Sequence, residues 1–337
     1  SRVPSPGSRA MRALVTGGGG FLGGAICRAL RAQDHEVVAL QRSAAPALAE
    51  LGVQVHCGDL ADASAVSAAA KACDVVFHVA AKAGHWGSKD DYFRANVLGT
   101  RNVLGACQQH GISRLVYTST PSVVHAGDDL EGVDERIPYA KSFLAHYPAS
   151  KAVAEREVLA ANGPALATVA LRPHLIWGPG DQHLLPRIVE RAKAGRLRLV
   201  GPPGKRIDAT YIDNAVQAHL LAAASLQPDA PHAGKAYFIS NGEPIDTEEM
   251  INRLLGCAGL PPVHSRIPFW LAYAVGAVLE ATYGGLKLQG EPIMTRFVAE
   301  QLATAHWYDI SAAEHDFGYQ PKVSMAQGFT ALRTALR

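Results

Sequence analysis

The chain has 337 residues, a formal net charge of +2, 48% hydrophobic residues and 18% charged residues. This length suits one large domain with a smaller addition, and this composition is typical of an α/β protein with a substantial core. The near balance of charge, without a Lys/Arg run, argues against a nucleic-acid partner. The five cysteines are scattered and show no C-x-x-C spacing. They argue against a disulfide framework or a metal site and favour the cytoplasm.

Residues 1–10 contain no apolar run and do not resemble a signal peptide. We expect them to be a disordered tail or a cloning remnant, with Met11 as the native start. The most apolar stretch, Ile267–Val278, spans 12 residues, whereas a membrane-spanning helix needs about 20. We therefore expect no spanning segment and an amphipathic helix here. Contact with a membrane surface, or a place in the wall of an apolar substrate channel, is the alternative.

Short runs rich in Val and Leu alternate with Ala-rich helical stretches in the first half of the chain. The expected strands are 13–16, 36–41, 53–57, 75–79, 114–118 and 169–171, and the expected helices are 25–33, 63–72 and 96–109. Continuous apolar strands separated by helices predict a Rossmann-type, doubly wound parallel sheet that is covered on both faces.

The pattern changes after about Gly178, where Pro and Gly become frequent and strands become sparse. Helices are expected at 183–194, 213–225, 246–255, 267–283 and 324–336. We assign residues 11–178 to a cofactor-binding domain and residues 179–337 mainly to a smaller, helix-rich substrate-binding domain. Strands returning to the sheet would make this boundary interwoven.

A glycine-rich loop directly follows the first expected strand and opens a helix. Its glycines have G-x-x-G-x-x-G spacing, in which the first permits a tight turn and the second lets a pyrophosphate approach the backbone. The third lets the helix pack closely on the strand, and the phosphates of a dinucleotide would lie on the free N–H groups of the helix. The cofactor-binding residues expected here are Gly17, Gly20, Phe21, Leu22 and Gly23.

The end of the second strand favours NADP(H) over NAD(H). A carboxylate at this place would accept from the ribose 2′-hydroxyl of NAD, whereas a 2′-phosphate requires a guanidinium. The chain has no acid there and offers Arg42 and Ser43. After the third strand, Asp59 is expected to accept from the adenine amino group, and it could also cap the next helix.

Tyr147 and Lys151 are the expected catalytic pair, because they lie four residues apart on one face of an expected helix. The ammonium and the charge of an oxidised nicotinamide would lower the pKa of the phenol toward working pH, so that it could act as acid or base. Lys151 could also hold the nicotinamide ribose. A second Y-x-x-x-K pattern, Tyr283 to Lys287, contains Gly-Gly, which disfavours a helix, and we interpret it as a coincidence.

Hydroxyl groups at the end of the fifth strand are expected to polarise a substrate carbonyl beside Tyr147. Three candidates follow one another there: Ser119, Thr120 and Ser122. The residues alone leave open which of them does this.

Taken together, these segments resemble the extended short-chain dehydrogenase/reductase superfamily from Met11 onward. The motifs in family order are the glycine loop, G-D-L at 58–60, N-V-L-G-T at 96–100, Y-T-S-T at 117–120, Y-P-A-S-K at 147–151, R-P-H-L-I-W-G-P at 172–179 and D-I-S-A-A at 309–313. Within the superfamily, A-A at 80–81, G-H-W-G at 84–87, D-A-T-Y-I-D-N at 208–214 and the segment 291–297 are similar to the 3β-hydroxysteroid dehydrogenase-like branch.

The resemblance implies further site residues. Thr120 falls at the place of the family's catalytic Ser, and Asn96 falls at that of an Asn supporting the active-site helix. Additional cofactor contacts would be Leu60, Ala80, Ala81, Pro173 and Ile176. Substrate contacts would come from His85, Trp86, Trp177 and His183. A homodimer through helices 96–109 and 146–162 is also expected.

Within this branch, the chain is similar to the bacterial reductases of long-chain olefin biosynthesis. That similarity implies NADPH-dependent interconversion of 2-alkyl-3-oxoalkanoic and 2-alkyl-3-hydroxyalkanoic acids, and association with a β-lactone synthetase and a β-lactone decarboxylase. Three alternatives remain: a 3β-hydroxysteroid-type dehydrogenase, a nucleotide-sugar epimerase or dehydratase, and a non-catalytic NADP sensor. A dehydratase would need a carboxylate pair after the strand Thr, where this chain has Pro121 and Ser122. A sensor would not need the Tyr–Lys pair.

Overall fold

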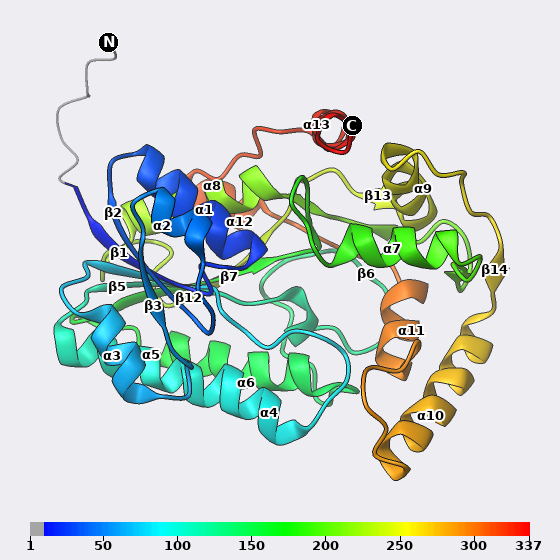
Figure 1. Cartoon of the computed structure of the whole chain (residues 1–337), viewed down its shortest axis with the longest axis horizontal. Helices are drawn as coiled ribbons and strands as arrows, with labels where there is room; N and C mark the ends of the chain where they lie inside the picture. Colours follow the sequence, from blue (N-terminus) through cyan, green and yellow to red (C-terminus); the bar gives the residue numbers. More distant parts are fainter. Residues whose placement is uncertain (1–9) are drawn as a thin grey trace.

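The structure, a computed structural model, describes residues 10–337 (Figure 1). Residues 1–9, most of the expected tail, lie outside the described residues. Seven parallel strands form the central sheet in the order β12-β7-β5-β4-β1-β2-β3. The strand bounds are β1 (Arg12–Thr16), β2 (Glu36–Gln41), β3 (Gln54–Cys57), β4 (Val75–His78), β5 (Arg114–Thr118), β7 (Ala167–Pro173) and β12 (Lys235–Ile239). This order confirms the predicted doubly wound sheet.

Helices cover both faces of this sheet because its central strands are apolar on both sides. Every residue of β4 and β7 is buried. One face carries α1 (Phe21–Ala32), α2 (Pro46–Glu50), α8 (Ile212–Ser225) and α12 (Ser311–Phe317) (Figure 1). The other carries α3 (Ala63–Ala70), α4 (Lys89–Phe93), a π-helical turn (Arg94–Leu98), α5 (Gly99–His110) and α6 (His146–Ala160).

Short strands join the two halves of the chain beside the central sheet. The order β13-β10-β15-β6 combines β6 (Leu130–Val133) with β10 (Arg206–Ile207), β13 (Ile245–Asp246) and β15 (His306–Tyr308). Two parallel pairs are β8 (Ile176–Trp177) with β11 (Thr210–Tyr211), and β9 (Leu199–Val200) with β14 (Arg266–Ile267). The remaining helices are a 3-10 turn (Pro121–Val123), α7 (Leu184–Lys193), α9 (Thr247–Cys257), α10 (Phe269–Gly285), α11 (Arg296–Ala303) and α13 (Met325–Ala335).

Strand β12 comes from the part of the chain assigned mainly to substrate binding, yet it pairs with β7 at the edge of the Rossmann sheet. Its register aligns Tyr237 with Leu171 and Phe238 with Arg172. The central sheet is therefore completed by a strand from the region that we assigned mainly to substrate binding, and the boundary between the two parts is interwoven.

Helices α10 and α11 project together beside the small sheet, at the lower right of Figure 1. They pack closely because a Cβ added at Gly276 would lie 2.6 Å from the carbonyl carbon of Thr295. The apolar residues that α10 leaves exposed are Phe269, Trp270, Leu271, Val275 and Val278. Within residues 10–337, no helix combines the length and hydrophobicity required to cross a bilayer.

Candidate active site

The glycine loop between β1 and α1 has the backbone that a pyrophosphate site requires. Gly17 has a φ of +73°, and its carbonyl accepts from the Gly20 N–H at 2.9 Å. A Cβ at Gly23 would lie 2.2 Å from the Gly17 carbonyl oxygen, so only glycine fits there. Gly20 precedes α1 without a side-chain cap, which leaves the first N–H groups of the helix available to an anion.

This loop lies against β4, as a dinucleotide site of this kind requires. A Cβ at Gly17 would meet the Cα of Ala80 at 3.0 Å. Ala81 is exposed just beyond it, and Phe21 and Leu22 begin the helix. The small residues at both positions, Gly17 and Ala80, fit the close approach of a nicotinamide dinucleotide to the backbone.

The residues expected around the adenosine lie at the neighbouring strand ends. Arg42 and Ser43 are exposed after β2, and the Ser43 carbonyl accepts from the Gln41 amide at 2.8 Å. Asp59 is half exposed, accepts from the Ala61 N–H at 2.9 Å and faces a guanidinium 3.7 Å away. The interpretation of Asp59 as a helix cap was wrong. Asp62 caps α3 by accepting from two backbone N–H groups.

Leu60 and the segment after β7 occupy the places expected for further cofactor contacts. Leu60 packs against the start of α5, where a Cβ at Gly99 would meet its side chain at 2.9 Å. Pro173 ends β7 and is buried, and Ile176 is half-buried in β8. The structure therefore places these residues beyond the carboxyl ends of the sheet, where α/β folds bind their ligands.

Helix α6 carries both members of the expected catalytic pair. Tyr147 lies in its first turn and is partly exposed, whereas Lys151 is 2% exposed. The Lys151 ammonium donates to the Thr118 carbonyl at 2.6 Å and lies 4.2 Å from the centre of the Tyr117 ring. The helix thus delivers the phenol to the carboxyl end of β5 and fixes the lysine behind it.

The pKa of Tyr147 differs from the value expected from the sequence. Burial raises the pKa of the phenol, and only the Thr120 hydroxyl acts in the opposite direction. Burial also lowers the pKa of Lys151 to about 7, partly countered by Glu155. The Lys151 ammonium donates to a backbone carbonyl and not to the phenol. Without a bound cofactor, the desolvation of Tyr147 therefore has a larger effect on its pKa than the charge of Lys151.

The hydroxyl groups after β5 have different environments. The Thr120 hydroxyl lies close enough to the phenol of Tyr147 to lower its pKa against the effect of burial, and it lies 2.9 Å from the Ser122 hydroxyl. Ser119 is 4% exposed, and its Oγ has no hydrogen-bond partner among the described residues. Of the three hydroxyls, Thr120 is the one that acts on the pKa of the Tyr147 phenol.

Asn96 supports the active-site helix, as the resemblance implied. It lies in the π-helical turn before α5, a feature often found at functional sites. Its side-chain amide donates to the Ser150 hydroxyl at 2.9 Å and to the Lys82 carbonyl at 3.0 Å. The side-chain carbonyl of Asn96 accepts from the Lys82 N–H at 2.7 Å. Asn96 thus links the catalytic helix to the loop after β4.

His78 extends this network to the glycine loop. The Thr16 hydroxyl accepts from two backbone N–H groups, so it donates to Nδ1 of His78 at 2.8 Å. The Thr100 hydroxyl donates to the backbone carbonyl of Asn96 and therefore accepts from Nε2 of His78 at 2.9 Å. Burial, with a contribution from Lys151, lowers the pKa of His78 to about 3, which keeps the ring neutral in this role.

A buried ion pair one turn after Lys151 was missed by the sequence analysis. Glu155 is fully buried and binds Arg172 through contacts of 2.5 and 3.0 Å. The Tyr139 phenol also donates to Glu155 at 2.6 Å. The signal was an acid four residues after the catalytic lysine, on the same helical face. It became meaningful only once β7 placed Arg172 opposite.

The expected substrate contacts do not all reach one place. Trp86 is half-buried and makes an edge contact with Tyr283, with ring centroids 6.2 Å apart. His85 lies beside it and is 3.3 Å from the Pro292 carbonyl. His183 is exposed just before α7.

The prediction for Trp177 was wrong. Its side chain is fully buried in the core, where its ring lies 4.5 Å from that of Phe329 and 5.4 Å from that of Tyr211. Strand β8 pairs with β11, which turns the indole toward α13 and away from the site. Trp177 therefore stabilises the fold and cannot line a substrate pocket.

Tyr283 and Lys287 do not form a second catalytic pair. Helix α10 continues through Gly284 and Gly285, contrary to the expectation that these glycines would disfavour it. Lys287 lies beyond the helix with a φ of +50° and is exposed. The two side chains therefore share no helical face, and the interpretation as a coincidence fits the structure.

A cavity of about 560 Å³ adjoins the start of the catalytic helix. Its wall includes Trp86 and Gly87 from the loop after β4, His146 from α6, and Ala277 from α10. Pockets of 300–1,000 Å³ are the usual size for small organic ligands.

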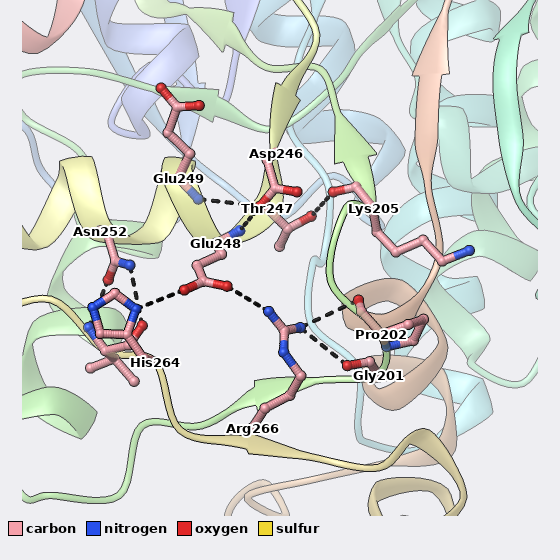
Figure 2. A network of polar contacts seen from close by, with 11 residues as sticks. Gly201, Pro202, Lys205, Asp246, Thr247, Glu248, Glu249, Asn252, His264 and Arg266 are labelled. Atoms are coloured by element: carbon pink, nitrogen blue, oxygen red, sulfur yellow. Dashed lines mark hydrogen bonds and ion pairs between the residues drawn. The ribbon is translucent and has the colours of Figure 1, made fainter.

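A second hollow beside β14 is closed by side chains. Figure 2 shows Glu248 between His264, at 2.8 Å, and Arg266, at 2.6 Å. Arg266 also donates to the Gly201 carbonyl at 3.1 Å. The remaining space is about 20 Å³, enough for one water molecule. This ion-pair network stabilises the predicted substrate-binding part without forming a ligand site.

Comparisons with known proteins show what the whole chain is similar to. The chain is 55% identical over 327 residues to a 2-alkyl-3-oxoalkanoate reductase of Stenotrophomonas maltophilia, covering 96% of this chain and 99% of that one. It is 52% identical to a protein of the same name from Shewanella oneidensis, covering 98% and 87%. Thermus thermophilus UDP-glucose 4-epimerase, solved in complex with NAD, is 27% identical, with a TM-score of 0.73 over 97% of this chain and 99% of that one.

The family follows from a match that covers most of the chain. Residues 14–269 match the profile described as the 3-beta hydroxysteroid dehydrogenase/isomerase family. That range contains the glycine loop, the strand-end hydroxyls and the Tyr147–Lys151 helix described above. The chain is a nicotinamide-dependent oxidoreductase that belongs to the 3-beta hydroxysteroid dehydrogenase/isomerase family.

Proposed function

We propose that this enzyme reduces the 3-keto group of long-chain 2-alkyl-3-oxoalkanoic acids with NADPH, and oxidises the 3-hydroxy acids in reverse. The observation that carries the proposal is the position of Tyr147 and Lys151 on α6 at the carboxyl end of β5, where Lys151 donates to the Thr118 carbonyl at 2.6 Å. The substrate class is supported by two relatives at 52–55% identity over nearly their whole lengths.

The protein's own residues supply the proton and the orientation. Thr120 orients the substrate carbonyl, and Tyr147 donates a proton to its oxygen as the carbon accepts hydride. A bound reduced nicotinamide supplies that hydride. Because the pKa of Tyr147 is raised by burial, the phenol holds its proton at neutral pH, which suits the direction of reduction. Lys151, held by the Thr118 carbonyl, would position the nicotinamide ribose.

The preference for NADPH rests on the end of β2. Arg42 and Ser43 are exposed there, and the adjacent side chain is the neutral Gln41. A guanidinium forms charge-assisted bonds to a phosphate, whereas an acid at this place would repel it.

The remaining parts of the proposal concern the surroundings of the enzyme. Helices α5 and α6 lie side by side, joined by an ion pair of 2.7 Å between Arg101 and Glu157, and they would form the homodimer interface. The cytoplasm would be the compartment, and the exposed apolar residues of α10 could contact a membrane surface. A β-lactone synthetase and a β-lactone decarboxylase would act on neighbouring steps of olefin biosynthesis.

One experiment compares three substrate types with the purified full chain. NADPH oxidation should follow addition of a 2-alkyl-3-oxoalkanoic acid, and NADH should support it poorly. A 3-keto steroid and a UDP-sugar should give far lower kcat/KM values. A clear preference for the steroid or the sugar would replace the substrate assignment. Absence of turnover with all three substrates would favour the alternative of a non-catalytic sensor.

A further inference from the structure

The 560 Å³ cavity beside α6 is lined by a wall of small residues on α10. Ala277 and Ala281, one helical turn apart, form this wall. Trp86 and Leu144 line other parts of the cavity. Alanine side chains at i and i+4 leave a continuous shallow strip along a helix. Such a strip can accept a linear apolar chain along its length.

The position of this wall is fixed by contacts between α10 and α11. The Arg296 guanidinium donates through Nε to Glu280 at 2.7 Å, and its backbone N–H donates to the same carboxylate at 2.7 Å. Gly276 lets the two helices approach within contact of the Thr295 backbone. These contacts fix the position of the Ala277 strip relative to α11.

The same ion pair determines the charge of the cavity. Glu280 and Arg296 both line it and neutralise each other. An unpaired carboxylate in that wall would repel an acidic substrate and would favour water over an alkyl chain. With the pair formed, the α10 wall offers apolar carbon and no net charge.

We propose that this cavity holds an alkyl chain of the substrate, and that Ala277 sets the chain length the enzyme accepts. This inference rests on the proposed function, because it names the part of the molecule that binds the chain. His146, which directly precedes Tyr147, lines the cavity, so a chain attached to a carbonyl at Tyr147 would lie next to it.

Gly87 is a poor site for testing this inference, although it also lines the cavity. Its φ is +134°, which side chains rarely adopt, and a Cβ there would lie 3.3 Å from the Tyr92 ring. A substitution at Gly87 would combine backbone strain with steric blocking. Ala277 lies in regular helix, so added volume there acts only on the cavity.

The test compares A277L with A274L. Ala274 is exposed on the same helix three residues earlier, so the same substitution adds the same atoms to solvent. Each buried methylene contributes about a fourfold gain in kcat/KM. A277L should therefore lose roughly 50-fold on the longest 2-alkyl-3-oxo acids and less than about threefold on the shortest. A274L should keep the profile of the unsubstituted enzyme.

A binding measurement separates this inference from the proposed function. Octanoic, dodecanoic and hexadecanoic acids are titrated against the cofactor-free chain while tryptophan fluorescence is recorded, with W86F identifying the signal of Trp86. Affinity should rise with length and should stop rising at a shorter acid in A277L. A281L is a second variant on the next turn if A277L does not fold.

Each outcome has one meaning. Equal chain-length profiles for A277L and A274L, or no length-dependent signal from Trp86, overturn the alkyl-chain assignment even if the enzyme reduces alkyl keto acids. A truncated binding profile without turnover of any alkyl keto acid supports the cavity assignment and overturns the proposed reaction.

Discussion

The amide of Asn96 donates to the hydroxyl of Ser150 across 2.9 Å and joins the turn before α5 to the catalytic helix. Ser150 in turn donates to the Tyr147 carbonyl at 2.9 Å. The backbone of Tyr147, the proposed proton donor, is thus held by hydrogen bonds that run through Ser150 to Asn96.

Replacing Asn96 with Ala should lower kcat by about 10- to 100-fold, since a displacement of about 1 Å in a catalytic group has an effect of this size. Asn252→Ala is the matched control. Asn252 binds both the N–H and the carbonyl of Val263, as Asn96 does for Lys82, but outside the active site. Both variants should lower the melting temperature, and only the first should lower kcat. Equal activity losses would show that Asn96 acts through stability alone.

Tyr147→Phe should reduce turnover at least 100-fold while NADPH binding changes little, because only the proton donor is removed. Lys151→Ala should lose turnover and also weaken NADPH. Steady-state kinetics and fluorescence titration of NADPH measure the two effects. Tyr283→Phe is the control and should behave like the unsubstituted enzyme. A normal rate in Tyr147→Phe would remove this phenol from the mechanism.

Arg42→Ala should weaken NADPH by about 1.5–3 kcal/mol, the usual contribution of a hydrogen bond to a charged group, and should leave NADH nearly unchanged. Dissociation constants for both cofactors provide the measurement. If both weaken equally, Arg42 supports the loop and does not read the 2′-phosphate.

Glu155→Gln should destabilise the protein by about 3–5 kcal/mol, because it leaves the Arg172 guanidinium buried without its counter-charge. Glu157→Gln, two residues later on the same helix, breaks a partly exposed pair with Arg101 and should change stability by less than about 1 kcal/mol. Urea unfolding of both variants measures the difference. Similar midpoints for the two variants would contradict the importance of the buried pair.

Acid should destabilise the protein below about pH 6.5. Burial lowers the pKa of His78 and His306 to about 3 and that of His125 and His219 to about 4. Unfolded histidines titrate near 6.5, so at lower pH the unfolded state binds more protons and the free energy of unfolding falls. The loss continues until the pH reaches the folded pKa values.

The slope of that loss can be measured by urea unfolding at several pH values between 7 and 4. Each of the four histidines adds up to about 1.4 kcal/mol per pH unit. His306→Gln should reduce this slope by the contribution of one bound proton, up to about 1.4 kcal/mol per pH unit. His183→Gln is the control at an exposed position and should leave the slope unchanged. A pH-independent stability across this range would contradict the burial of these rings as neutral bases.

The sequence predicted the structure best where the local backbone or the periodicity of a helix admits only one residue type. Gly17 and Gly23 could be recognised because a Cβ at either position has no room, and Tyr147 with Lys151 because a helix repeats its face after four residues. These positions predicted the sheet, the loop and the catalytic helix from neighbours in the chain.

The prediction was weaker where a role depends on residues distant in the sequence. Trp177 follows a strand that leads to the site, but β11 and α13, which come later in the chain, enclose its ring in the core. Ala277 has no local pattern, and the spacing of Glu155 from Lys151 had no meaning by itself, because their partners come from the loop after β4 and from β7. Side-chain direction in short strands and pocket walls is decided by tertiary packing.

The place of β12 at the edge of the sheet has a consequence for biosynthesis. Strand β7 is complete at Pro173, but its outer edge stays unpaired until Lys235–Ile239 has left the ribosome. During that interval the nascent chain exposes the edge of a strand whose residues are all buried in the folded protein, the kind of surface that promotes aggregation. Co-translational folding of the cofactor half must therefore wait for a segment encoded far downstream, and a fragment ending near Gly178 should precipitate when expressed alone.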